Sequence, residues 1–216
     1  MKKGDFIWGA VILLISVIMI VPVTHEIFVS ATTSHPYIMG FVKFAIMATM
    51  GELLAIRIIS GSWKKSSGMF YKAAVWGIVG LMIVLMFSVY SNGVAAAEKA
   101  GYLFAFQGGL GTFVNALYVS VILNFTFGPM FMAAHRVSDT YIDMRVEGNK
   151  VSVGECIEKI DWKGFIKFVV FKTIPLFWIP AHTITFLLPG QYRVLWAAYL
   201  SIALGIILSY ARRKKS

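Results

Sequence analysis

Six stretches of this chain are each long and apolar enough to cross a lipid bilayer as a helix. About 30 Å of hydrocarbon takes roughly 20 apolar residues in helical form. The 216 residues are 58% hydrophobic and 14% charged, which is more apolar side chain than a soluble domain of this size can bury. The sequence therefore predicts an all-α, polytopic membrane helix bundle that forms a single domain over residues 1–216. The expected spans are residues 6–23, 37–59, 73–97, 102–127, 164–187 and 193–211.

The positions of Lys and Arg predict the orientation of these spans. Fourteen basic residues fall on one side of the membrane, whereas only Lys99 and Arg193 fall on the other. Basic residues concentrate on the cytoplasmic side, so both termini are expected in the cytoplasm. The net charge of +10 is then an orientation signal, and we expect no nucleic-acid partner. The fourteen residues are Lys2, Lys3, Lys64, Lys65, Lys72, Arg136, Arg145, Lys150, Lys159, Lys163, Arg212, Arg213, Lys214 and Lys215.

The first apolar stretch bears on localisation. Its length exceeds that of a typical signal-peptide core, so we expect an uncleaved span. The Lys- and Ile-rich composition favours a prokaryotic plasma membrane, the bacterial inner membrane, with lipid as an obligatory partner. The sequence is also compatible with a homo-oligomer.

Residues 128–163 are expected to form the largest cytoplasmic loop. Gly128-Pro129 is predicted to break or kink the fourth span. Just before the fifth span, charged residues recur at every fourth position, which predicts an amphipathic helix at the membrane interface. Its charged face is either a regulatory surface or, more simply, a solvated face. These charged residues are Glu155, Lys159, Lys163 and Lys167.

Polar residues inside the predicted spans are candidates for a solute pathway. An ionisable group is costly in hydrocarbon and usually faces the bundle interior or a cavity. His182 lies in the fifth span, which Pro175 and Pro180 are predicted to interrupt. Arg193 follows the predicted Pro189-Gly190 turn on the sparsely charged side, so we expect a carboxylate or carbonyl to hold it. The pathway candidates are Glu52, Gln107, Asn115, His182 and Arg193. Packing contacts between helices are the alternative for each of them.

A second polar set follows the fourth span. His135 and Asp139 are four residues apart, as are Asp139 and Asp143, so on a helix they share one face with ion-pairing potential. We expect His135, Arg136 and Asp139 at a cytoplasmic mouth. The spacing supplies no third and fourth zinc ligand, so no metal is expected. No nucleophile, phosphate or dinucleotide motif occurs, so we expect no cofactor and no enzymatic activity.

The C-terminal part carries a distinctive set of residues: Trp178, Pro180, Phe186, Pro189, Tyr192-Arg193-Val194 and Leu200-Ser201. This set resembles the C-terminal signature of the Mpv17/PMP22 membrane-protein family, with His182 at the family's Gln position and Thr185 at its Asn position. Phe127-Gly128-Pro129 and Gly51-Glu52 resemble two further family motifs. The resemblance is best over residues 165–215. It implies a small polytopic protein, some relatives of which are linked to pore or channel behaviour.

These observations lead to three hypotheses for the function. The first is a channel or carrier for small solutes or ions. The second is a non-catalytic scaffold that binds a partner in the membrane and uses its polar groups only for packing. The third is a membrane-embedded enzyme that acts on a lipid or quinone through His135 and Asp139.

Overall fold

The computed structural model describes residues 2–213, except for the side chains at 208 and 210–213. This part of the chain is almost entirely helical. No strand occurs in the described residues, so the predicted all-α class is confirmed. The basic residues Lys214 and Lys215, used for the orientation, lie outside this range. The helices are α1 (Lys3–Ile20), α2 (Pro22–Ser34), α3 (Pro36–Ser60), α4 (Met69–Lys99), α5 (Gly108–Val146), α6 (Val153–Lys159), α7 (Trp162–Gly164), the π-helix η1 (Phe165–Trp178), α8 (Ile179–Leu187) and α9 (Gly190–Arg213).

Within the described residues, four helical segments are long and apolar enough to cross a membrane. The chain therefore has the composition of an integral membrane protein. The six-span prediction agrees with the structure at these four positions. Its other two spans correspond to α3 and α9, and that these two helices cross the membrane stays a prediction. The four segments are Lys3–Ile20, Met69–Lys99, Gly108–Val146 and Trp162–Leu187.

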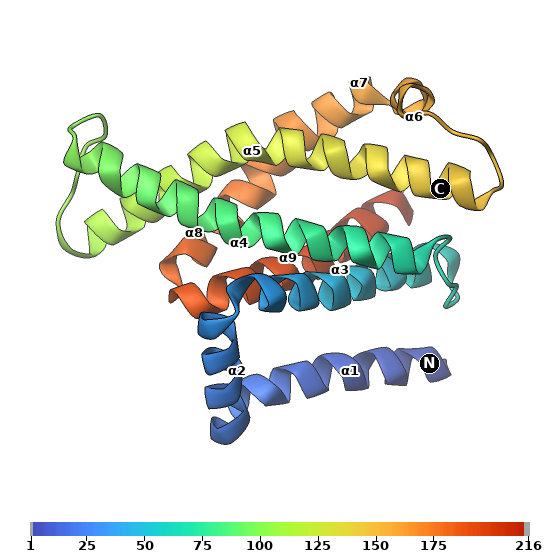
Figure 1. Cartoon of the computed structure of the whole chain (residues 1–216), viewed down its shortest axis with the longest axis horizontal. Coiled ribbons are helices and arrows are strands. Elements are labelled where there is room, and N and C mark those ends of the chain that lie inside the picture. Colours follow the sequence, from blue (N-terminus) through green and yellow to red (C-terminus); the bar gives the residue numbers. More distant parts are fainter. Residues whose placement is uncertain (1, 214–216) are drawn as a thin grey trace.

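Helices α3, α4 and α9 pack closely because small residues occupy their crossings. A Cβ on Gly80 of α4 would meet the backbone carbonyl of Gly40 on α3. On the other flank of α3, a Cβ on Gly51 would lie 3.2 Å from the Cα of Ile202 on α9. Small residues let helix backbones approach in this way within a membrane. The resulting three-helix layer forms one wall of the molecule (Figure 1).

Helices α1 and α2 form an arm on the outside of this layer. Figure 1 shows α2 standing across the long helices, with α1 running beside α3. The arm is fastened at the N-terminal end of α1, where Asp5 forms an ion pair with Arg57 of α3 at 2.9 Å and accepts a hydrogen bond from the Trp63 indole at 2.8 Å. Farther along, the Trp8 indole donates to the Met50 carbonyl. Asp5, Arg57 and Trp63 therefore lie at one end of the bundle.

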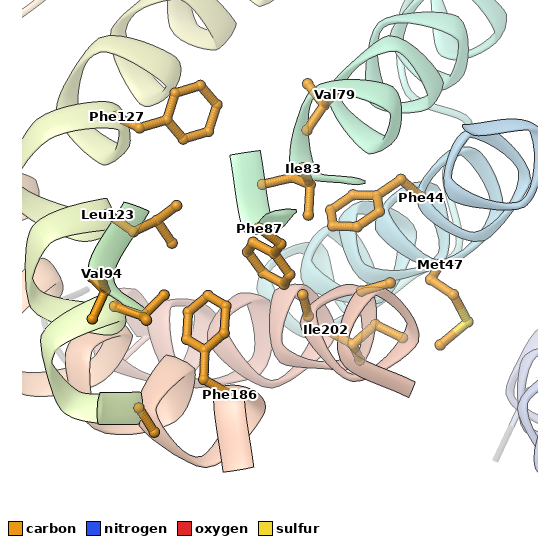
Figure 2. Close-up of a cluster of buried hydrophobic side chains, with 14 residues drawn as sticks. Phe44, Met47, Val79, Ile83, Phe87, Val94, Leu123, Phe127, Phe186 and Ile202 are labelled. Atoms are coloured by element: carbon orange, nitrogen blue, oxygen red, sulfur yellow. The ribbon is translucent and has the colours of Figure 1, made fainter. Parts of the chain in front are cut away.

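The apolar core lies where α3, α4, α5, α8 and α9 meet (Figure 2). The rings of Phe87 on α4 and Phe186 on α8 lie 4.9 Å apart between centroids. Leu123 and Phe127 reach toward them from α5, while Phe44, Met47 and Ile202 complete the cluster from α3 and α9.

The fourth predicted span begins six residues later than expected. Helix α4 ends at Lys99, and Gly101 takes the left-handed conformation with φ = 79°. Residues 102–107 are therefore non-helical, and α5 starts at Gly108, where φ is again positive at 64°. Glycine adopts this conformation without steric cost, which lets the chain turn twice here.

Of the predicted break or kink at Gly128-Pro129, the break does not occur. Helix α5 continues through Pro129 to Val146, so more than half of the expected 128–163 loop is helical. Proline in a helix costs about 3 kcal/mol, and tertiary packing of the flanking turns can offset that cost. Here Phe127 is buried in the core on one side of the proline, and Ile142 is buried farther along.

The helix expected before the fifth span is present as α6, but it does not extend through Lys163 and Lys167 as one helix. Helix α6 ends at Lys159, and the carboxylate of Asp161 accepts the Gly164 N–H at 2.8 Å to start a new helix. Cys156 and Ile160 are buried. The four charged side chains at every fourth position are nevertheless all exposed, as a solvated face requires.

The prolines of the fifth span do not interrupt it. Pro175 lies inside η1, and Pro180 lies in the first turn of α8. The helical segment is therefore continuous from Trp162 to Leu187. The change from π to α geometry occurs at Ile179. π-Helical turns are rare and frequently lie at functional sites. The Pro189-Gly190 turn is confirmed between α8 and α9.

Candidate functional site

An elongated cavity of about 510 Å³ lies between α3, α4, α5, η1, α8 and α9. One face of α5 lines it from Asn124 to Asp143, through pairs of residues that recur every fourth position. These two residues are nineteen positions apart, which corresponds to about 28 Å at the helical rise. The cavity thus follows α5 for a length close to the hydrocarbon thickness of a bilayer.

Six aromatic side chains line the cavity among its aliphatic and polar residues. The rings of Phe127 and Phe131, one turn apart on α5, stack with 5.7 Å between centroids. His135 continues this row one turn later, and its ring lies 4.0 Å from that of Trp76 on α4. The aromatic lining residues are Phe44, Trp76, Phe127, Phe131, Phe165 and Trp178.

Charged residues gather at one end of the cavity, where α3 and α5 finish and α4 begins. Lys72 of α4 is only 7% exposed and connects two carboxylates, since its Nζ lies 2.8 Å from Asp143 on α5 and 3.5 Å from Glu52 on α3. Ser66 also donates to Glu52 at 2.9 Å. The buried ammonium group of Lys72 thus connects α4 to α3 and α5 at this charged end.

His135 and Asp139 form a second polar contact at the charged end. Nδ1 of His135 lies 3.2 Å from Oδ2 of Asp139, with the i,i+4 spacing predicted from the sequence. Arg136 also lines the cavity, and its guanidinium lies 5.9 Å from the centroid of the Phe165 ring. The predicted polar face of His135, Arg136 and Asp139 therefore faces one space.

The deep end of the cavity carries a buried amide–imidazole pair. Asn124 of α5 is 3% exposed, and His182 of α8 is 8% exposed. Their side chains lie within hydrogen-bond distance, since the Asn124 Nδ2 is 3.0 Å from the His182 Nδ1. Asn124 Nδ2 also donates to the Ser120 carbonyl at 2.8 Å, and the Trp178 ring stacks on His182 with 5.0 Å between centroids. Beyond this pair, Phe87 and Phe186 close the space.

Three side chains that line the cavity carry a buried polar atom without a hydrogen-bond partner. These atoms are Nε2 of His135, Oδ1 of Asp139 and Nε1 of Trp178. The described part of the chain holds four such side-chain atoms, and only Thr49 Oγ1 belongs to a residue outside the lining. Buried polar groups are normally satisfied, so this concentration indicates a place where a bound molecule or ordered water supplies the partners.

The structure brings some of the predicted site residues together and not others. Glu52 and His182 line the cavity, as do all three residues predicted at the mouth. Gln107 is exposed and precedes α5, because the helix starts later than predicted. Asn115 donates to Glu98 of α4 at 2.7 Å and serves as a contact between helices. Neither Gln107 nor Asn115 lines the cavity.

Arg193 has a structural role at the α8–α9 turn. Its guanidinium donates to the carbonyls of Leu188 at 2.8 Å and Phe186 at 3.0 Å. The prediction that a carbonyl holds this residue is therefore confirmed, whereas its place as a pathway candidate is not, because Arg193 does not line the cavity.

Sequence reasoning missed Asn124, Lys72 and Trp178. Asn124 lies eleven residues before His135, which is three helical turns, so a continuous α5 would have placed both on one face. Because the sequence predicts a break or kink at Gly128-Pro129, it does not place Asn124 and His135 on one helical face. From the sequence, Lys72 is only one of the fourteen basic residues of the cytoplasmic side, and its two carboxylate partners lie on other helices.

The comparisons with known proteins do not identify a relative. No family model, curated protein or solved structure matches this chain. Among the described residues, no group of three or more His, Cys, Asp or Glu side chains is arranged to hold a metal ion. The chemistry of the site is therefore argued from its own residues.

Proposed function

We propose that this chain is a membrane carrier that binds a small organic solute in the cavity along α5. The observation that carries the proposal is the convergence of Glu52, His182 and the unpartnered atoms of His135, Asp139 and Trp178 on one cavity. Its volume of about 510 Å³ lies within the range of small-molecule sites.

A carrier is favoured over an open channel because the cavity has an apolar end. The Phe87–Phe186 contact and the buried side chains of Val94, Ala116 and Val119 fill the bundle beyond His182. A permanently open pore would need a continuous path there. A carrier instead exposes a binding site to one side at a time, with binding near the middle of the membrane.

A scaffold explains the unpartnered atoms less well. Polar groups that serve only packing are expected to satisfy one another, as Asn115 and Glu98 do. The membrane-embedded enzyme remains a second candidate because His135 and Asp139 meet at 3.2 Å inside the cavity. Incubation with labelled membrane lipids or quinones would detect it as a product that His135→Gln abolishes.

Membership of the Mpv17/PMP22 family is a separate proposal. It rests on the residues of α8 and α9 that resemble the family signature, and the carrier proposal does not depend on it.

The test of the carrier proposal fills the cavity with one side chain. A Cβ on Gly128 would make only ordinary contacts, the nearest being Ile174 Cδ1 at 3.7 Å, so Gly128→Leu places its remaining atoms in the cavity. We expect flux of a transported solute into proteoliposomes to fall at least about tenfold, because the variant excludes solute from the site. The readout is uptake across a panel of small metabolites, ions and organic solutes.

Gly93→Leu is the matched control. Gly93 lies in α4, and a Cβ there would meet nothing within 4 Å. This variant should retain wild-type flux. Equal flux in both variants, or no flux of any solute by the wild-type protein, would contradict the carrier proposal.

A further inference from the structure

We infer that the solute is a slender organic cation with an aromatic body, and this inference rests on the carrier function proposed above. It combines two features of the cavity: an unbalanced carboxylate at the charged end and an aromatic row that leads away from it. Each feature has its own structural basis.

The charged end has more carboxylates than cations. Three carboxylates and two basic side chains lie at this end of the cavity, and His135 adds a charge only when it is protonated. With His135 neutral, one negative charge is in excess. The three carboxylates are Glu52 of α3 and Asp139 and Asp143 of α5, and the two cations are Lys72 of α4 and Arg136 of α5.

Asp139 is the carboxylate of this set that forms no ion pair with Lys or Arg in the described part of the chain. Lys72 is shared by Asp143 and Glu52, at 2.8 Å and 3.5 Å. The side chain of Arg136 is exposed and lies over the Phe165 ring. Among the described residues, Asp139 has one ion-pair partner, His135, which its Oδ2 meets, and its Oδ1 is buried without a hydrogen-bond partner. A carboxylate oxygen in this state is stabilised by a cationic or hydrogen-bond-donating group of a ligand.

The aromatic row supplies the rest of the site. Trp76, Phe131 and Phe127 follow Asp139 toward the deep end, and Trp178 lines the cavity near His182. Ring faces attract organic cations and also pack against aromatic ligands. An anionic solute would meet the excess carboxylate, and a neutral apolar solute would leave it unpaired. The two features together select a cation.

The test uses three probes that share a two-ring body and differ in charge. They are N-methyl-4-phenylpyridinium, its neutral isostere 4-methylbiphenyl, and the anion biphenyl-4-carboxylate. Binding to the full chain in lipid nanodiscs is followed by tryptophan fluorescence, since Trp76 and Trp178 line the cavity, and partitioning into empty nanodiscs is subtracted. We expect the cation to bind at least about tenfold more tightly than either of the other probes.

Asp139→Asn locates the effect. The amide oxygen still accepts a hydrogen bond from His135, so the variant removes charge with little change in shape. It should lower the affinity for the cation about tenfold and leave that for 4-methylbiphenyl within about twofold. Glu158→Gln is the matched control, because it removes the same charge from an exposed residue of α6 outside the cavity and should change neither affinity.

The outcomes separate this inference from the carrier proposal. Tighter binding of the neutral or anionic probe to the wild-type protein, or equal cation affinity in Asp139→Asn, would overturn the cation inference. If the probe that binds the wild-type protein most tightly still failed to bind Gly128→Leu, the cavity would remain the solute site and the carrier proposal would stand. The comparison of probes on the wild-type protein needs no variant, so it decides the matter even if Asp139→Asn does not fold.

Discussion

Single polar side chains in this protein fall into two groups that the sequence alone does not separate. Arg193 donates to backbone carbonyls at the α8–α9 turn, and Asn115 donates to Glu98 of a neighbouring helix. His135 and Asp139 each retain an unpartnered buried atom. The first group is expected to affect stability, and the second is expected to affect the binding of a solute.

Replacing Arg193 tests the first group. Arg193→Ala leaves the carbonyls of Leu188 and Phe186 without their donor, so we expect a loss of about 1–3 kcal/mol in the free energy of unfolding. Unfolding in mixed detergent micelles measures this loss. Lys99→Ala, which removes an exposed basic residue, should cost much less. Equal stability of the two variants would show that the carbonyl contacts of Arg193 contribute little.

The helices are positioned by close approaches that depend on individual glycines. Gly80 of α4 faces Gly40 of α3 with no room for a side chain, whereas Gly93 of the same helix faces open space. Alanine favours a helix over glycine by about 1 kcal/mol in both places. Only the packing term differs between them, which makes the pair a direct measure of the α3–α4 contact.

We therefore predict opposite effects for two identical substitutions in α4. Gly80→Ala should destabilise the protein by about 1–3 kcal/mol, because α3 and α4 must move apart or distort. Gly93→Ala should be neutral or stabilising. Thermal unfolding of both variants in detergent gives the comparison, and a Gly80→Ala protein as stable as Gly93→Ala would show that the two helices do not depend on this crossing.

The two ends of the molecule differ in charge, in agreement with the orientation predicted from the Lys and Arg positions. Asp5, Arg57, Lys72 and Asp143 come from α1, α3, α4 and α5, and their ion pairs all lie at the charged end of the bundle. The exposed turn at Tyr102 lies at the opposite end of α4 and α5. If the charged end is cytoplasmic, the two ends of the molecule differ in their access to a membrane-impermeant reagent.

Single-cysteine labelling tests this polarity in intact cells. Tyr102→Cys should react with an impermeant maleimide from outside, whereas Lys150→Cys should react only after permeabilisation, because the two positions lie in turns at opposite ends of α5. The native Cys156 is 0% exposed and should give no background. Labelling of both positions from the same side would contradict the predicted topology.

The sequence by itself determined the helical class, the four segments long and apolar enough to cross a membrane and the i,i+4 contact of His135 with Asp139. These properties depend on apolar length and local spacing, which are properties of a single helix. The tertiary structure alone decided that α5 continues through Pro129, and that Glu52 and His182 face the cavity whereas Asn115 pairs with Glu98. Helix continuity and side-chain partners depend on which helices pack together, so no local pattern contains them.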